Sequence, residues 1–311
     1  MITRRHIRIK VMQSLYSYFS YSKQSNVVEK EMIKNIDGVL DLYFLVISLL
    51  LDLHTYGEVI LSDNKNKNFP DFKDSDELNF VNNRLILAVR DNHDIMKRIK
   101  KGSLILKNND LDIVRKIFLK IYKSSQFASY LELEECCFLE DKKFIEFILR
   151  DVILDDEIFH HLLKENNIYW RDDLPFVGLF LMHTLHDLEE SHCLPFFASV
   201  FKNIDDRKFT LELFRATISH NDEFDNLINK YAKNWDLERI ANMDKLLIKM
   251  ALSEICSFSQ IPVNVSFNEY IEISKYYSTE GSKSFINGIL DKIVHDFKKS
   301  ERFDKVGRGL V

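Results

Sequence analysis

Three observations predict an all-α protein. The 311 residues include only 8 glycines and 4 prolines, too few turn formers for the many hairpins of a β fold. Apolar residues recur with helical periodicity along most of the chain. Hydrophobic residues make up 46% and charged residues 29% of the sequence, enough to bury one large or two medium cores, and the length favours two units.

The apolar periodicity predicts each helix in order along the chain. The expected helices cover residues 3–21, 27–55, 76–101, 109–124, 141–151, 155–166, 176–190, 206–219, 222–233, 236–258, 266–277 and 282–300. The first helix has Thr3 as its candidate N-cap and an apolar stripe that includes Val11 and Leu15. Ile261-Pro262 separates two of the C-terminal helices, because proline pushes the preceding residue out of the α region.

Two stretches between helices are expected to be joints. Residues Ser62 to Asn79 are rich in Asp, Asn and Lys and contain Pro70, which makes them the clearest linker. A second joint is expected at Cys193 to Asp206.

Charge is distributed unevenly along the sequence. The net charge is −5, but the first 28 residues carry +5 and the segment from Lys298 onward carries +3, which leaves −13 for residues 29 to 297. An acidic body with basic ends favours a localised anionic ligand over general adhesion to nucleic acid.

The start of the first helix is a candidate phosphate-binding site. Arg4 and Arg8 continue the apolar stripe, and because arginines are poorly tolerated in a core, we expect the first two turns to overhang the bundle and meet phosphates. Tyr16 lies about 20° from Arg5 on a wheel of 100° per residue, where its ring is suited to base stacking. The simpler alternative is a solvated basic helix start.

The turn before the last helix is a second candidate site. A helix N-terminus exposes free N–H groups, Lys283 adds a positive charge, and Phe285 offers a stacking surface, a combination that suits an RNA phosphate and base. The alternative is that Ser282 is a plain N-cap and Phe285 faces the core.

Enzymatic and metal-binding classes find little support. The run Gly281-Ser282-Lys283-Ser284 is similar to the end of a P-loop, but it lacks the earlier glycine and a preceding strand. The crowded histidines match no strong metal signature; they are His160, His161, His183, His186 and His192, beside Cys193. No nucleophile or dinucleotide motif is present, so we expect no enzyme, cofactor or metal.

The compartment follows from cysteine usage and hydropathy. Cys136, Cys137, Cys193 and Cys256 show no pairing pattern, so we expect reduced core residues. The best apolar run, Leu42 to Leu53, is too short to span a bilayer, and we expect a cytoplasmic protein without a membrane contact.

Several blocks resemble the NusB family of transcription antitermination factors. The C-terminal blocks are Asn234–Ile240, Met243–Leu247, Ile261–Val265 and Ser282–Asp291. Arg4 to Arg8, followed by Gln13 to Tyr16, is similar to the arginine-rich first helix of that family. The resemblance covers about residues 1–55 and 200–298.

The resemblance implies a NusB-like helical bundle with an additional inserted helical unit. We expect residues 1–62 and 201–311 to form the bundle and residues 63–200 to form the insert. A shift of 65 positions superposes Asp141 on Asp206 and Phe144 on Phe209, so we interpret the insert as a degenerate NusB-like repeat.

The resemblance further implies RNA binding without catalysis. The ligand would be a boxA-type single-stranded element of nascent ribosomal RNA, and the partners would be NusE, a small-subunit ribosomal protein, and the RNA polymerase antitermination complex. The implied RNA-binding residues are Arg4, Arg5, Arg8, Gln13, Tyr16, Ser282, Lys283, Phe285 and Asn287. Glu269 and Glu272 match an acidic partner-binding helix, although two solvated glutamates explain them equally well. Gly281 stands where family members often carry an acidic residue, so that contact is absent or replaced.

Two alternatives from other classes remain. In the first alternative, the chain is a helical protein-interaction scaffold in RNA metabolism, in which the RNA site has decayed and the insert supplies the binding surface. NusB-like domains also occur in RNA cytosine methyltransferases, but no α/β cofactor domain follows Asn287-Gly288, which favours a free-standing factor.

Overall fold

The computed structural model describes residues 2–21, 23–66, 78–102, 111–232, 240–303 and 305. The protein is all-α: the regular elements of these residues are helices, and no strand occurs among them. Contacts divide the chain into unit 1, Met1–Ile36 with Phe201–Val311, and unit 2, Asp37–Val200. The division falls within one helix, α2 (Ser25–Asn66).

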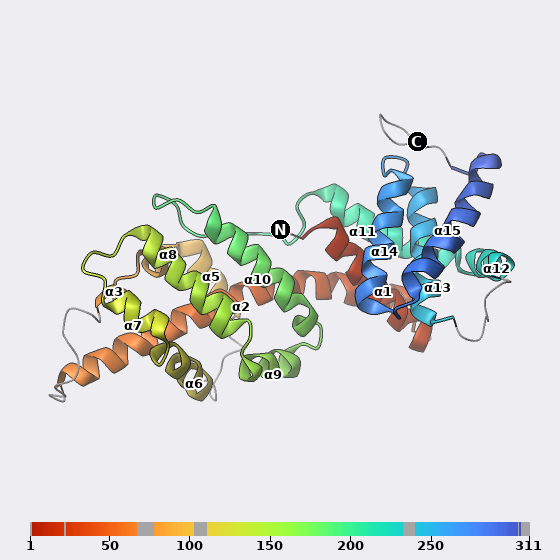
Figure 1. Ribbon diagram of the computed structural model, residues 1–311. Helices are drawn as coiled ribbons and strands as arrows, with labels where there is room; N and C mark the ends of the chain where they lie inside the picture. Colours follow the sequence, from red (N-terminus) through yellow and green to blue (C-terminus); the bar gives the residue numbers. More distant parts are fainter. Residues whose placement is uncertain are drawn as a thin grey trace. The chain divides into compact units, whose positions relative to one another are not determined.

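Unit 1 is organised around α13 (Asn242–Ser257). Its other helices are α1 (Arg4–Tyr21), the start of α2, α11 (Ile204–Ser219), α12 (Asn221–Tyr231), α14 (Val263–Tyr277) and α15 (Ser282–Lys299). α13 packs against α1, α11, α12, α14 and α15 (Figure 1). Because neighbours surround it, every residue from Leu246 to Ile255 is buried, which explains the nearly continuous apolar sequence of this helix.

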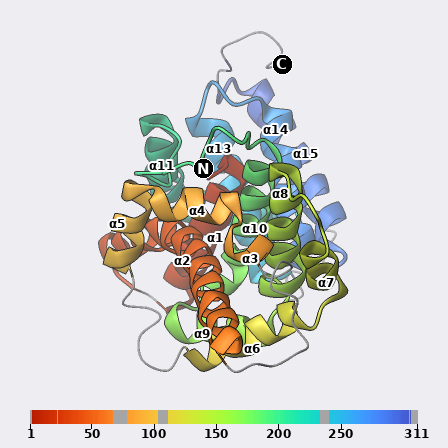
Figure 2. The same ribbon diagram turned by 90° about the vertical axis from the view of Figure 1, so that its left-hand side faces the viewer.

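Unit 2 holds the rest of α2 and the helices that follow it. They are α3 (Leu78–Val81), α4 (Arg84–Asp91), α5 (His93–Gly102), α6 (Leu111–Tyr122), α7 (Ser125–Leu131), α8 (Phe138–Phe147), the π-helix η1 (Ile148–Ile153), α9 (Glu157–Asn166) and α10 (Trp170–His186). Figure 2 views α2 nearly along its axis, with α4 above it and α6 below.

The core of unit 2 is strongly aromatic. Its buried rings include Phe80, Phe118, Phe127 and Phe144. The ring centroid of Phe80 lies 6.0 Å from that of Phe118, 5.7 Å from that of Phe127 and 6.0 Å from that of Phe144. α2 approaches this cluster at Gly57, where an added Cβ would lie 2.4 Å from a ring carbon of Phe80. Glycine at this position therefore permits close packing between α2 and the rings.

The prediction of a single helix over residues 76–101 is wrong, because two asparagines interrupt the segment. The side chain of Asn83 accepts a hydrogen bond from Ile86 N at 3.1 Å, and that of Asn92 accepts one from Ile95 N at 3.1 Å. Each asparagine caps the start of a new helix, so the segment forms α3, α4 and α5. The short helix α7 was not expected.

Some expectations lie outside the described residues or need correction. Residues 67–77 of the expected linker and 234–239 of the first resemblance block lie outside them. The four cysteines are free, but the expectation of core residues is wrong: Cys137 is exposed and the other three are half-buried. Among the helices described, none is long and apolar enough to cross a membrane.

The two units show parallel features at positions 65 residues apart. Asp141 and Asp206 are both buried, with 2% and 6% of their surfaces exposed. Each lies beside an arginine that begins a helix: Arg4 Nε is 3.1 Å from Asp206, and the backbone N–H of Arg84 donates to Asp141 at 3.1 Å. These parallels support our proposal that the insert is a degenerate repeat of the bundle.

Candidate nucleic-acid interface

The first turn of α1 presents two arginines at the surface. Thr3 begins the helix, because its hydroxyl accepts a hydrogen bond from His6 N at 3.3 Å. The side chains of Arg4 and Arg5 are 45% and 53% exposed. Two guanidinium groups one residue apart on a rigid helix can reach neighbouring phosphates.

Arg8 does not overhang the bundle, which corrects the sequence-based expectation. Its side chain is only 3% exposed, and both its Nε and its Nη2 donate to the carboxylate of Glu254, at 2.8 and 2.7 Å. Burial alone would lower the pKa of Arg8, but the hydrogen bonds and charge of Glu254 outweigh it and raise that pKa. Arg8 is therefore a buried structural cation bound to Glu254 and Glu269, and only 3% of its side chain is exposed where it borders the neighbouring groove.

Glu254 on α13 is the residue that makes the burial of Arg8 tolerable. It is fully buried and also accepts hydrogen bonds from Ser266 Oγ at 2.7 Å and from Tyr270 OH at 2.9 Å. A buried charge pair is tolerated only when its remaining hydrogen-bonding positions are satisfied. The sequence carries one signal of this site: a single acidic residue within the apolar stretch of α13.

Glu269 on α14 links the exposed and the buried arginine. Arg5 Nε and Nη2 donate to its two oxygens at 2.9 and 2.7 Å, and Arg8 Nη1 donates to it at 3.4 Å. The hydrogen bonds from Arg5 and the positive charges of both arginines lower the pKa of Glu269, against the opposing effect of burial. Glu269 thus holds Arg5 in place; its expected role in binding a partner stays a proposal.

A groove runs beside these arginines. One part, about 540 Å³ in volume, is lined by Arg4 and Arg5 and by residues of α14 such as Val265. An adjoining part of about 220 Å³ shares Arg4, Gln260 and Ile261 with it and reaches Lys208 on α11. The two parts therefore lie next to each other at Arg4.

At the start of α15, two of the expected contact residues point inward. Ser282 is 1% exposed, and its hydroxyl donates to Asp244 on α13 at 2.8 Å. Phe285 is 4% exposed and belongs to the core. The expectation that these two side chains face RNA is therefore corrected: Ser282 turns inward to Asp244, a partner 38 residues away that the local pattern does not reveal, and Phe285 packs in the core.

The other residues of this region remain at the surface. Lys283 and Asn287 are exposed, and Asn287 donates to Asp291 at 3.2 Å. Glu272 is half-exposed and bonded to Lys275; this hydrogen bond lowers the pKa of Glu272, as do the charges of Lys275, Arg5 and Lys283. The starts of α1 and α15 and the exposed face of α14 thus form one surface.

Tyr16 lies in a separate pocket on unit 1, away from the groove lined by the arginines. This pocket, about 490 Å³ in volume, also includes Phe19, Lys245 and Lys249. Lys249 Nζ is 2.7 Å from Asp225 and 5.2 Å from the centroid of the Phe19 ring. The expected pairing of Tyr16 with the guanidinium groups is therefore not formed within either pocket. Gln13, between the two regions on α1, is half-buried.

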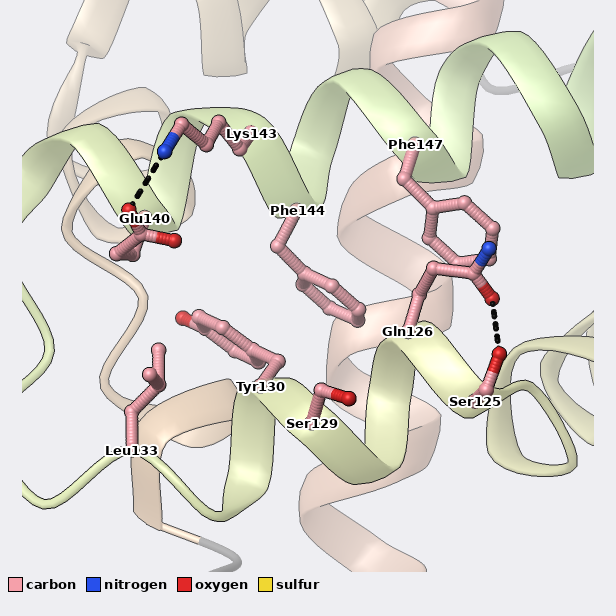
Figure 3. A pocket seen from close by; sticks show the side chains of 9 residues that line it. All are labelled: Ser125, Gln126, Ser129, Tyr130, Leu133, Glu140, Lys143, Phe144 and Phe147. Atoms are coloured by element: carbon pink, nitrogen blue, oxygen red, sulfur yellow. Dashed lines mark hydrogen bonds and ion pairs between the residues drawn. The ribbon is translucent and has the colours of Figure 1, made fainter.

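Unit 2 has a groove of different chemistry, between α7 and α8 (Figure 3). It has a volume of about 340 Å³, and its floor includes Tyr130 and Phe144, whose rings stack with centroids 4.2 Å apart. The rim charges neutralise each other, since Lys143 Nζ lies 2.7 Å from Glu140. With no excess positive charge, this groove is less suited to phosphates than the one beside Arg4.

The crowded histidines of α9 and α10 do not form a metal site. Among the described residues, no group of three or more His, Cys, Asp or Glu side chains is placed to hold an ion. His160 instead makes a hydrogen bond with the carbonyl oxygen of Leu154 at 2.6 Å.

Fold and surface together define an all-α protein with an arginine-lined groove on one helical bundle. The NusB family model matches residues 191–295, which include α11 to α14 and most of α15 but not α1. The chain is 44% identical over 105 residues to the transcription antitermination protein NusB of Salinibacter ruber, covering 34% of this chain and 66% of that protein. It is 39% identical over 112 residues to the protein of that name from Chloroherpeton thalassium, covering 36% of this chain and 53% of the relative.

A third relative gives the same result. The transcription antitermination protein NusB of Thermodesulfovibrio yellowstonii is 42% identical over 95 residues, covering 30% of this chain and 63% of the relative. The chain therefore spans less than two thirds of the length of each of these three relatives. No solved structure matches. Over residues 191–295, about a third of the chain, this protein matches the NusB family.

Proposed function

We propose that this protein is an RNA-binding transcription antitermination factor without catalytic activity. Support comes from its relatives, whose names describe transcription antitermination, and from the exposed guanidinium groups of Arg4 and Arg5 beside a groove of unit 1. The second observation carries the RNA part of the proposal, because guanidinium groups on an open groove bind phosphates while leaving bases free for other contacts.

The proposed ligand is a boxA-type single-stranded element of nascent ribosomal RNA, as the family resemblance implies. Arg4, Arg5 and Lys283 would contact phosphates, and Asn287 would contact the RNA nearby. Tyr16 and Gln13 would act further along α1. Arg8, Ser282 and Phe285 would position these groups from the core.

The proposed protein partner is the small-subunit ribosomal protein that acts as NusE, within the RNA polymerase antitermination complex. Glu272 is the better candidate for its binding, because its side chain is 39% exposed whereas that of Glu269 is 18% exposed and occupied by two arginines. The partner would complete the RNA-binding surface on unit 1.

The test is fluorescence anisotropy of a labelled boxA-like RNA titrated with the protein, with and without the ribosomal partner, beside a scrambled RNA. We expect tighter binding to the boxA-like sequence, further strengthened by the partner. Replacing Arg5 by Gln should flatten the dependence of log affinity on log salt by about 0.7, the contribution of one phosphate in single-stranded RNA. Lys292→Gln, an exposed lysine of α15 that lines none of these pockets, is the matched control. Equal affinity for both RNAs under both conditions would contradict the proposal.

A protein-interaction scaffold is the second candidate function. It is favoured by the aromatic groove of unit 2, whose rim charges neutralise each other, and by the absence of a side chain at Gly281. In that case the purified ribosomal partner would bind the protein while neither RNA did, which separates the two functions in the same titration.

A further inference from the structure

One exposed aromatic side chain on unit 1 lies outside the pockets lined by Arg4, Arg5 and Tyr16. Tyr276, in the last turn of α14, is 82% exposed, the highest value among the large hydrophobic side chains described. Within the described part of the chain, its ring makes no ring contact and its hydroxyl makes no hydrogen bond. Packing therefore does not account for a tyrosine at this position.

Tyr276 lies on the same face of α14 as the carboxylate that holds Arg5. Glu269, Glu272 and Tyr276 are spaced at i, i+3 and i+7, so they share one face of the helix. Glu269 holds Arg5 at one end of that face. Tyr276 lies about 10 Å further along the axis, at 1.5 Å per residue.

Cations lie around this end of the helix face. Lys275 forms a hydrogen-bonded ion pair with Glu272, one turn before Tyr276, and the positive charges of Arg5 and Lys283 also lower the pKa of this carboxylate. Lys283, at the start of α15, forms no ion pair among the described residues. An exposed ring on a rigid helix, with phosphate-binding cations nearby, is the arrangement by which proteins hold single-stranded nucleic acids.

We propose that Tyr276 is a base-stacking platform for the single-stranded RNA whose phosphates Arg5 and Lys283 hold. This inference rests on the proposed RNA-binding function and extends it to a residue outside the groove. The ring supplies a face to any base, so it adds affinity with little sequence selectivity, and selectivity must come from other contacts.

The test combines affinity with its salt dependence. Replacing Tyr276 by Ala should weaken binding of the boxA-like RNA roughly 5- to 150-fold, the loss expected for one stacked base. The salt slope should stay unchanged, because a neutral ring releases no counterions. Lys283→Gln should show the opposite pattern, with a slope flatter by about 0.7. Tyr276→Phe should keep wild-type affinity, since only the ring face is used.

Tyr21→Ala is the matched control, because Tyr21 is also exposed, at 74%, and lies at the far end of α1. A second readout is the fluorescence of 2-aminopurine placed at successive RNA positions: stacking on Tyr276 should quench one position, and Tyr276→Ala should restore its emission. Wild-type affinity in Tyr276→Ala would overturn the proposal. If that variant instead lost only the ribosomal partner, Tyr276 would belong to a protein contact.

The outcomes also separate this inference from the function on which it rests. If the wild-type protein binds neither RNA, both are overturned. If it binds boxA-like RNA and Arg5→Gln flattens the salt slope while Tyr276→Ala has no effect, only the stacking role fails.

Discussion

Replacing Arg8 by methionine tests the buried ion pair at the start of α1. Methionine keeps much of the apolar stem but leaves Glu254 fully buried, with hydrogen bonds only from Ser266 and Tyr270. Removing one partner of a buried pair costs about 3–5 kcal/mol. The neighbouring pair of Arg5, 53% exposed, is worth about 0–1 kcal/mol, so Arg5→Met is the matched control.

The assay is urea unfolding followed by far-UV circular dichroism. Hydrogen exchange of α1 and α13 amides assigns the transition that belongs to unit 1. With a denaturant slope of about 1–3 kcal/mol per molar, the Arg8 variant should lower the midpoint by roughly 1 M or more, and the Arg5 variant by much less. Adding Glu254→Gln to Arg8→Met should recover part of the loss, because the amide oxygen still accepts from Ser266 and Tyr270. Equal midpoints for the two single variants, or no recovery in the double variant, would refute this reasoning.

Three further predictions concern single residues. Burial lowers the pKa of His54 below its usual 6.5, so below about pH 6.5 His54 takes up a proton more readily in the unfolded chain than in the folded one. The stability of unit 2 should therefore fall as the pH drops below about 6.5. In chemical denaturation, His54→Gln should remove this contribution to the pH dependence. Gly57→Ala forces a methyl group onto the Phe80 ring and should lower the free energy of unfolding by about 1–3 kcal/mol. At Gly288 an added Cβ meets nothing within 4 Å, so Gly288→Ala should raise the free energy of unfolding by about 0.4–1 kcal/mol. Thermal unfolding of the two variants measures the difference. An added Cβ at Gly281 also meets nothing within 4 Å, so Gly281→Asp should keep the fold; because family members often carry an acidic residue here, it should raise affinity for the RNA or for the ribosomal partner about two- to fivefold, and unchanged affinity for both would show that this position makes no contact.

The open space around Gly288 has a consequence for sequence interpretation. A glycine in the run Asn287-Gly288 is consistent with close helix packing, yet an added Cβ would touch no neighbouring atom there. Gly57, which lies in no recognised motif, is by contrast a glycine that close packing requires, since an added Cβ would lie 2.4 Å from the Phe80 ring. Sequence alone does not distinguish them, because the difference lies in residues distant in the chain.

Most of the helices could be predicted because their periodic apolar faces are local properties of the sequence. The expected ranges 3–21 and 282–300 agree with α1 and α15 to within one residue at each end. Local patterns failed where a partner lies far away in the chain. The burial of Arg8 depends on Glu254, 246 residues later, and the inward turn of Ser282 depends on Asp244. The exposure of Tyr276 likewise follows from the absence of any such partner among the described residues.

The ion pair between Arg8 and Glu254 bears on how this protein changes during evolution. Replacing either residue alone is expected to cost a large part of the stability of unit 1, so we expect selection for folding to retain the arginine even without RNA binding. A descendant that no longer bound RNA would still begin with a basic first helix. The arginine-rich start of α1 is thus retained partly for folding. Replacement of Arg5 costs little stability, so a loss of function would first be seen as a change at that position.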